Sequence, residues 1–316
     1  MRKILLLLLL LMGNMAEAQQ EAMYTHYMYN IMAINPAYAG YEKKLTATLI
    51  HRSQWVSIPG APRFQTFSMH APIGDNVGAG LSFVNDQIGP ERNIAIKGYY
   101  SYTLRSEEKV KITFGLKAGL NMLQIGLSDL EIDEPDDPAF LNNIQSAFLP
   151  NFGFGIFVHS RNFYFGFSMP DLIQHDYLNN TIFSSSDLTL DSKKYYLLGG
   201  LSYAITDRLL FKPSGFIGLS KATENQGGVD VEGDLTALFI ADNKFAGGIM
   251  IRSSDAIAFL AGIMITKDLE FGYSFDMLLS NKTFRYNGGS HEIVLKYNFR
   301  NKLKYRPVDL SCPTFQ

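Results

Sequence analysis

Six residues of this sequence are suited to acid–base or metal chemistry: His26, His51, His70, His159, His175 and His291. None lies in an H-E-x-x-H or comparable ligand spacing, and the sequence has neither a G-x-S-x-G elbow nor a Walker A loop. The single cysteine, Cys312, excludes an intramolecular disulfide and a cysteine-based zinc site. His51 and His159 fall near predicted strand ends, where a barrel hydrolase could carry its catalytic groups, but no nucleophile–base pair accompanies them. We therefore predict no enzyme and no catalytic, cofactor-binding or metal-binding residues.

One acidic stretch, residues 133–138, could offer oxygen ligands to a cation such as Ca²⁺. It lacks the spaced D-x-[DN]-x-[DN]-G pattern of a calcium loop. Pro135 and Pro138 disfavour helix and strand across it. We interpret the stretch as a solvated loop.

Nine charged residues occupy positions that alternate with apolar or small ones. They are Lys97, Lys111, Lys117, Asp230, Glu232, Asp234, Glu270, Asp276 and Glu292. A Lys facing lipid at the bilayer midplane would cost about 2–4 kcal/mol, so we expect all nine to face the interior of a barrel. Opposite charges there could line a polar channel or cargo-docking interior, or could pair and close the lumen, and the sequence favours neither.

The elements that carry these residues are predicted by a period of two. From Val110 to Met122 the even positions are apolar and the odd positions are polar or small, which is longer than a usual strand of a soluble sheet. The same alternation recurs along the chain. It predicts fourteen strands, at 44–53, 63–72, 76–85, 92–105, 109–123, 150–159, 162–170, 193–206, 207–219, 229–240, 243–253, 256–266, 268–280 and 289–299.

The connections between these strands alternate in length. Those after even-numbered strands are short, whereas most after odd-numbered strands are longer, such as 54–62, 86–91, 124–149 and 171–192; only 254–255 breaks the pattern. Outer-membrane barrels combine short periplasmic turns with long outer loops. We therefore predict an all-β fold, a transmembrane antiparallel β-barrel of about 14 strands with both chain ends in the periplasm, over a soluble β-protein.

The first residues form a targeting signal. Arg2 and Lys3 precede an apolar run over 4–12, and Ala16-Glu17-Ala18 is an A-x-A site, which predicts cleavage after Ala18. The run is shorter than the roughly 20 residues of a spanning helix. We expect a protein of the cell outer membrane. It divides into a signal peptide (1–18), an N-terminal periplasmic or plug segment (19–43), the barrel (44–299) and a periplasmic tail (300–316).

One segment before the first predicted strand and one residue after it are candidates for a functional role. The segment 20–43 has no alternation but is rich in tyrosine, which favours an ordered plug of the lumen over a periplasmic handle or a disordered leader. Trp55, the only tryptophan, follows Arg52 and Gln54. It is either an interfacial anchor or an outer recognition contact.

The composition excludes other classes of protein. The chain of 316 residues is 47% hydrophobic and 18% charged, which is too apolar for a disordered chain. Its 28 basic and 30 acidic residues give a net charge of −2, which provides no electrostatic footprint for nucleic acid.

Several motifs carry a family resemblance. They are Tyr24-Thr25-His26-Tyr27-Met28-Tyr29-Asn30, Asn35-Pro36-Ala37-Tyr38-Ala39-Gly40, Arg52-Ser53-Gln54-Trp55, Gly60-Ala61-Pro62, Asn85-Asp86-Gln87-Ile88-Gly89-Pro90, Phe114-Gly115-Leu116-Lys117-Ala118-Gly119, Pro150-Asn151-Phe152-Gly153-Phe154-Gly155, Gly272-Tyr273-Ser274-Phe275-Asp276 and Gly289-Ser290-His291-Glu292. In this order and spacing the chain resembles the PorP/SprF family of outer-membrane proteins of the type IX secretion system of Bacteroidetes, over roughly residues 19–299. The tail over 311–316 departs from the usual family ending, which puts tail-specific contacts in doubt.

The resemblance implies a non-enzymatic component that assists secretion or cell-surface attachment of cargo proteins, including the large adhesins of gliding motility. The implied partners are the lipid bilayer, cargo with C-terminal sorting domains and other type IX components. The candidate partner or cargo contacts are Arg52, Gln54, Trp55, Asn35, Pro36 and Tyr38. A passive diffusion porin is the main alternative, and a barrel hydrolase is the third.

Overall fold

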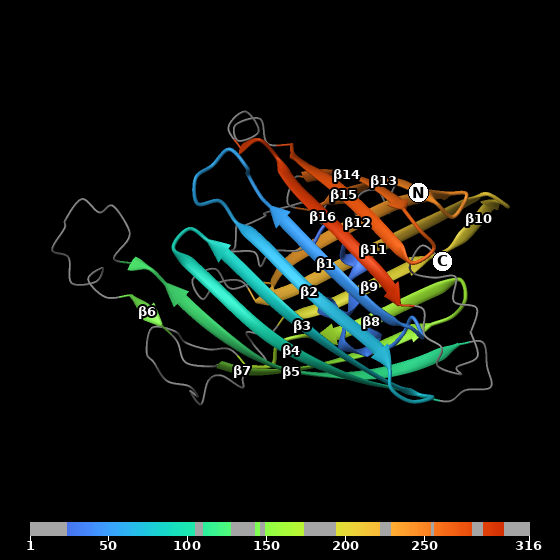
Figure 1. The fold of residues 1–316 in the computed structure, drawn as a ribbon, viewed down its shortest axis with the longest axis horizontal. Coiled ribbons are helices and arrows are strands. Elements are labelled where there is room, and N and C mark those ends of the chain that lie inside the picture. The colour runs from blue at the N-terminus through green and yellow to red at the C-terminus, as the bar shows by residue number, and fades with distance from the viewer. Residues whose placement is uncertain are drawn as a thin grey trace.

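The fold is a closed antiparallel β-barrel (Figure 1). The computed structural model describes residues 24–104, 110–127, 143–145, 149–173, 194–221, 229–253, 256–279 and 287–299. Strands that are adjacent in the ring pair antiparallel, and the last strand, β16 (Ser290–Phe299), pairs with the first, β1 (Leu45–Ser53), from Leu45↔Phe299 to Ser53↔His291. This last pairing leaves the sheet without a free edge, as a barrel in lipid requires.

The described residues contain sixteen strands, which form a ring with fourteen places. The remaining strands are β2 (Arg63–Pro72), β3 (Val77–Ile88), β4 (Glu91–Thr103), β5 (Lys111–Ile125), β6 (Ile144–Gln145), β7 (Leu149–His159), β8 (Phe163–Met169), β9 (Tyr195–Leu201), β10 (Tyr203–Thr206), β11 (Leu209–Lys221), β12 (Val229–Ala241), β13 (Phe245–Arg252), β14 (Ala256–Met264) and β15 (Leu269–Leu278). The short β6 pairs only with β5, outside the ring. Strands β9 and β10 both pair with β11 and are separated by Ser202 alone, so they occupy one place in it. The predicted fold is confirmed.

The two faces of the barrel differ as the alternation predicts. On β16, Ile293 and Leu295 are exposed on the outer face, whereas Glu292, Val294 and Lys296 are buried on the inner face. Successive side chains of a strand point to opposite faces, so an apolar exterior and a mixed interior follow from the sequence period.

The barrel has two open ends, or mouths, which we call the turn end and the loop end after the connections between strands found there. At the turn end the chain passes between strands through short turns, including 73–76 between β2 and β3 and 160–162 between β7 and β8. At the opposite loop end, residues 54–62 join β1 to β2. The predicted loop at 86–91 is an exception. There β3 continues to Ile88 and β4 begins at Glu91, because their pairing extends through polar residues where the apolar alternation has already ended.

Before β1 lie three short helical turns: η1 (Tyr27–Tyr29), α2 (Ile31–Ile34) and η2 (Pro36–Tyr38). None of the helices in the described part of the chain has the length and apolar character needed to cross a bilayer.

Candidate functional site

The segment that precedes β1 lies inside the barrel, where the strands surround it (Figure 1). Every residue from Tyr24 to Tyr41 except Ala33 is buried. At the loop end the Tyr24 hydroxyl lies 2.8 Å from Thr66 Oγ1 of β2. At the turn end the Ser101 hydroxyl of β4 donates to the Ala39 carbonyl at 2.6 Å. The segment therefore follows the barrel axis from one mouth to the other.

Local sequence explains how the segment turns inside this space. The side-chain Oδ1 of Asn35 accepts from the Ala37 backbone amide at 3.0 Å, and Pro36 opens η2 without an amide that would need a partner. The Asn35 amide also donates to the carbonyls of Ile156 and Phe167 on the barrel wall, at 3.0 and 3.2 Å. One polar side chain thus shapes the turn and joins it to two strands.

Small residues on the wall let the segment approach closely. A Cβ at Gly115 of β5 would collide with the backbone of Pro36 and Ala37, and one at Gly78 of β3 would collide with the Ala39 carbonyl. Glycine at these positions is therefore required by the enclosed backbone rather than by the strand, which ordinarily disfavours it.

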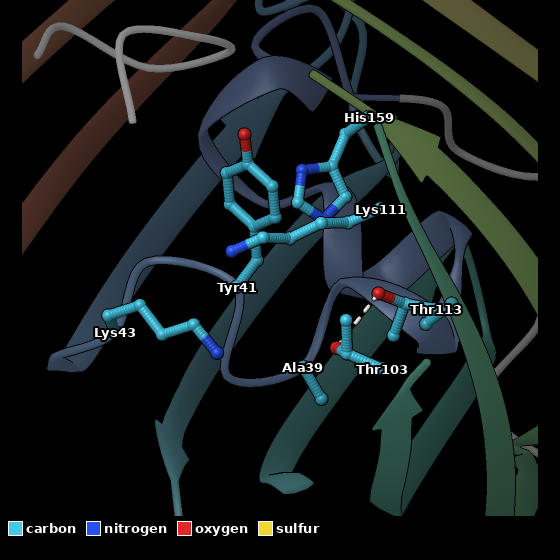
Figure 2. Close-up of a pocket in the computed structure, with 8 residues that line it drawn as sticks. Ala39, Tyr41, Lys43, Thr103, Lys111, Thr113 and His159 are labelled. Atoms are coloured by element: carbon cyan, nitrogen blue, oxygen red, sulfur yellow. Dashed lines mark hydrogen bonds between the residues drawn. The ribbon is translucent and has the colours of Figure 1, made fainter. Parts of the chain in front are cut away.

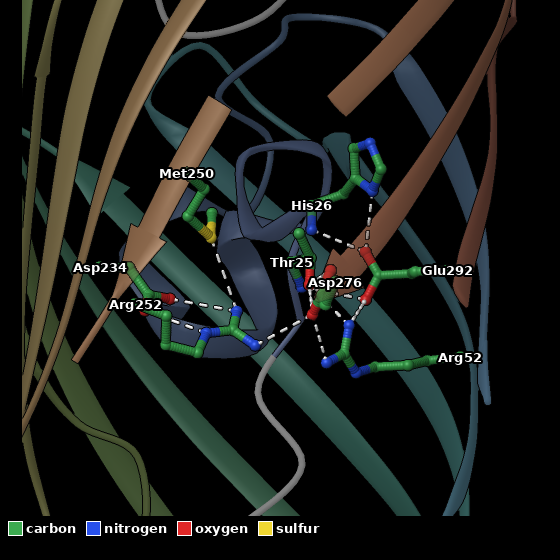
Figure 3. A network of polar contacts seen from close by, with 8 residues as sticks. All are labelled: Thr25, His26, Arg52, Asp234, Met250, Arg252, Asp276 and Glu292. Atoms are coloured by element: carbon green, nitrogen blue, oxygen red, sulfur yellow. Dashed lines mark hydrogen bonds and ion pairs between the residues drawn. The ribbon is translucent and has the colours of Figure 1, made fainter. Parts of the chain in front are cut away.

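A buried network holds the start of the segment at the loop end (Figure 3). The Arg52 guanidinium lies 2.7 Å from Asp276 Oδ2 and donates to Thr25 Oγ1 at 2.6 Å. The Thr25 hydroxyl in turn donates to Asp276 at 2.7 Å. Glu292 accepts from the His26 amide at 2.6 Å, and its Oε1 lies 2.9 Å from His26 Nδ1. Charge-assisted hydrogen bonds between residues far apart in sequence therefore join the segment to β1, β15 and β16.

A second guanidinium extends this network around the wall (Figure 3). Arg252 of β13 lies 3.1 Å from Asp234 of β12 and 3.3 Å from Asp276. Arg252 is not among the nine charged residues predicted to face the lumen. The sequence does contain a pattern that places Arg252 on the inner face, since Met250 and Arg252 alternate with the exposed Ile249 and Ile251. No comparable signal marked Thr25 and His26, because only the folded chain brings them to these carboxylates.

A separate pair holds the end of the segment at the turn end. The Lys296 ammonium of β16 lies 2.6 Å from Glu42 Oε1, and the hydroxyls of Tyr38 and Thr46 donate to the same carboxylate at 3.2 Å each. Burial alone would raise the pKa of Glu42, but the nearby Lys296 outweighs it and holds the pKa below its ordinary value. The negative charge of the buried Glu42 carboxylate is thus compensated by the Lys296 ammonium.

Aromatic contacts fill the middle of the enclosed region. The Tyr27 hydroxyl donates to Ser214 Oγ of β11 at 2.9 Å. Tyr38 packs edge-on against Phe157 of β7, with ring centroids 5.6 Å apart. The middle of the enclosed region is therefore filled by packed aromatic rings.

The nine charged residues assigned to the lumen lie on the inner face. Those that are buried are Lys117, Asp234, Glu270, Asp276 and Glu292, and those that are partly buried are Lys97, Lys111, Asp230 and Glu232. Lys117 pairs with Asp171 just beyond β8 at 2.8 Å. Glu270 accepts from the Asn298 amide at 3.2 Å.

The six candidate partner contacts separate into two groups. Asn35, Pro36, Tyr38 and Arg52 are buried inside the barrel, with Arg52 only 2% exposed. Trp55 is 38% exposed in the loop after β1 and Gln54 is half-buried. Arg52 therefore does not share an outer surface with Trp55. Contact of a partner with the buried group would require the segment to move.

The two histidines considered for catalysis lie in different surroundings. His51 is on the outer face, where its Nε2 lies 3.2 Å from Ser53 Oγ and its Nδ1 lies 3.4 Å from the Gln65 amide rather than from a carboxylate. His159 is buried on the inner face near the turn end. Within the described ranges, no group of three metal-ligating side chains comes together.

A family model described as type IX secretion system membrane protein PorP/SprF matches residues 16–297. No curated protein matches the chain.

Solved structures similar to the chain are distant. They include the CymD monoaromatic hydrocarbon channel (12% identity, 92% of this chain and 96% of that chain, TM-score 0.49). A second is the Ralstonia pickettii toluene transporter TbuX (10% identity, 85% of this chain and 93% of that chain, TM-score 0.46). A third is the Acinetobacter baumannii outer membrane protein Omp33 (10% identity, 82% of this chain and 100% of that chain, TM-score 0.45).

Proposed function

Since this chain belongs to the PorP/SprF family of type IX secretion system membrane proteins, we propose that it assists the secretion or cell-surface attachment of cargo proteins without catalysing a reaction. The single observation that carries the proposal is the segment Tyr24–Lys43, which is buried inside the barrel as far as Tyr41 except at Ala33 and is joined to the wall near both mouths. An interior occupied in this way suits a component that docks or retains a protein better than one that conducts solutes.

The enclosed segment acts as a plug in this proposal. At the loop end, Arg52 and Asp276 bind Thr25, and at the turn end Lys296 binds Glu42. Removing one partner of a buried ion pair leaves an uncompensated charge, which costs about 3–5 kcal/mol. Spontaneous release of the segment is therefore disfavoured, and the passive diffusion porin becomes the second candidate.

The hydrolase alternative has weaker support. The Ser53–His51 contact is the arrangement closest to a nucleophile–base pair, but Gln65 stands where a carboxylate would orient the imidazole. We place the function in binding rather than in chemistry.

The orientation of the barrel follows from its connections. We propose that the turn end faces the periplasm and the loop end faces the cell exterior, that the signal peptide is cleaved after Ala18, and that residues 300–316 form a periplasmic tail. Trp55 and Gln54 then lie on the outer side, where they are available to cargo with a C-terminal sorting domain, including gliding adhesins. Other type IX components would meet the turn end.

The test combines conductance with cargo retention. Wild-type protein in planar bilayers should give no steady large current, whereas a porin would. In cells that lack the native copy, a variant without part of 171–192 should form a heat-modifiable barrel and release surface cargo into the medium while other type IX substrates are exported. The control is a variant lacking residues 24–40, which should instead change conductance. Retention of cargo by both variants, with intact barrels, would contradict the proposal and favour the porin.

A further inference from the structure

A pocket at the turn end gathers cationic and hydroxyl-bearing side chains from four parts of the fold (Figure 2). Its lining includes Tyr41, Lys43, Thr103, Lys111, Thr113 and His159. Lys43 belongs to the enclosed segment, Lys111 and Thr113 to the start of β5, Thr103 to the end of β4 and His159 to the end of β7. The enclosed space is about the size of one water molecule and opens to solvent, so an anion could place one of its oxygens there while the rest of the group stays outside.

The two partly buried lysines of this pocket differ from two fully buried lysines elsewhere in the barrel. Lys117 and Lys296 each have a carboxylate within 2.8 Å. The ammonium groups of Lys43 and Lys111 have no hydrogen-bond or ion-pair partner in the part of the chain that the structure describes. Burial and the charge of Lys111 both lower the pKa of Lys43. Two like charges at one pocket repel each other, and a bound anion would remove that cost.

The surrounding groups are suited to the same ligand. His159 is 5% exposed, packs against the Tyr41 ring at 4.6 Å, and forms no hydrogen bond with a described residue. The hydroxyls of Thr103 and Thr113 lie 3.0 Å apart. Only one of these hydroxyls can donate to the other, so one hydroxyl hydrogen remains free for a ligand.

The backbone also presents Lys43 to the pocket. Its φ is +55°, in the left-handed region that lysine rarely occupies, and its amide donates to the Gly40 carbonyl at 3.2 Å. Among the described residues, Asp75 is the acid whose charge acts on Lys43, but Asp75 is exposed in the turn between β2 and β3 and forms no ion pair with it. Glu107 and Glu108, in the turn between β4 and β5, lie outside the described residues.

We propose that this pocket binds a single oxyanion group, a carboxylate or a phosphate, through the ammonium groups of Lys43 and Lys111 and a threonine hydroxyl. Such charge-assisted bonds are stronger than neutral ones. The inference is independent of the secretion role, since it rests on the pocket alone. An anion here would join the end of the enclosed segment to β5.

The experiment is calorimetric titration of the purified full-length protein in detergent, with inorganic phosphate in one arm and acetate in the other, at constant ionic strength. Saturable binding of either probe supports the site and assigns its ligand class. The variant K43Q/K111Q should bind at least about tenfold more weakly, since it loses both charge-assisted hydrogen bonds to the anion. K244Q is the matched control, because Lys244 is exposed at the same mouth, and it should bind like wild type.

Heat-modifiable mobility verifies that each variant is folded. Absence of saturable binding by wild type with both probes would overturn the proposal, as would equal binding by K43Q/K111Q. Binding that appears only in E107Q/E108Q would also overturn it, because the site would then belong to the chain's own turn.

Discussion

The guanidinium of Arg52 and the carboxylate of Asp276 lie 2.7 Å apart inside the barrel, although 224 positions separate them in the sequence. Arg52 stands on the first strand and Asp276 on the last strand but one, so their contact forms only when the barrel has closed. Thr25 lies between them, with its hydroxyl accepting from Arg52 and donating to Asp276. Closure of the barrel and enclosure of the segment therefore depend on the same atoms.

The first prediction concerns this pair. Asp276→Asn removes a buried carboxylate that faces Arg52 and Arg252, so it should lower the free energy of unfolding by about 3–5 kcal/mol. The midpoint of heat-modifiable mobility in urea would measure the loss. Asp242→Asn is the control, since Asp242 is 60% exposed and 3.8 Å from an exposed Arg208, and it should change stability by less than about 1 kcal/mol. Similar losses in both variants would refute the structural role of the buried pair.

The second prediction concerns the lipid face. Leu116 is 62% exposed and Phe165 is 50% exposed on the outer surface. Leu116→Arg or Phe165→Arg should impair insertion by about 2–4 kcal/mol if the site lies at the midplane. Lys117→Leu should still insert, because its side chain faces inward, although Asp171 loses its partner. Folding yield into lipid vesicles would separate the two classes, and equal yields would show that the facing assignment is wrong.

The strands were predictable from the sequence because each obeys a local rule. A lipid-facing position must be apolar, so the fourteen spans follow from alternation, as on β16. One strand is predicted over 193–206, and one place in the ring is found there, although Ser202 divides that strand into β9 and β10. The loop predicted at 86–91 was wrong because backbone pairing continues through polar residues such as Asp86 and Arg92 once the strands pass beyond the apolar alternation.

The interior was less predictable because its contacts are long-range. Alternation placed Glu292 and Asp276 inside, but nothing local indicated that Thr25 and His26 would meet them. The closeness of Arg52 and Trp55 in sequence predicts one outer contact, which is wrong for Arg52. A strand that alternates faces can separate such neighbours, and Arg52 turns inward.

The third prediction concerns orientation. An epitope tag inserted in 124–149 or 171–192 should be reached by antibody on intact cells, because both stretches follow odd-numbered strands of the ring. A tag at 106–108 should be reached only after the outer membrane is permeabilised. Labelling in the reverse pattern would mean that the turn end faces outward.

The fourth prediction concerns pH at the turn end. The pKa of Glu42 is held below its ordinary value of 4.5 by Lys296, so the folded barrel binds this proton less readily than the unfolded chain. The stability that Glu42 contributes is therefore present above about pH 4.5 and is lost as the pH falls through the lowered folded-state pKa. Glu42→Gln should be less stable than wild type at pH 7, and the difference should shrink on acidification. Unfolding midpoints from pH 7 to pH 3 would test this, and a constant difference would contradict it.

The last prediction isolates the enclosed segment from the barrel wall. Valine is well suited to a strand, but at Gly115 its side chain would collide with the backbone of Pro36 and Ala37. Gly115→Val should therefore displace the segment, at a cost of about 1–3 kcal/mol for overpacking, and should raise the conductance of the protein in planar bilayers. Gly247→Val is the control, because a Cβ at Gly247 would meet nothing within 4 Å and would face outward. A folded Gly115→Val barrel whose current matches that of Gly247→Val and wild type would mean that the segment does not close the lumen.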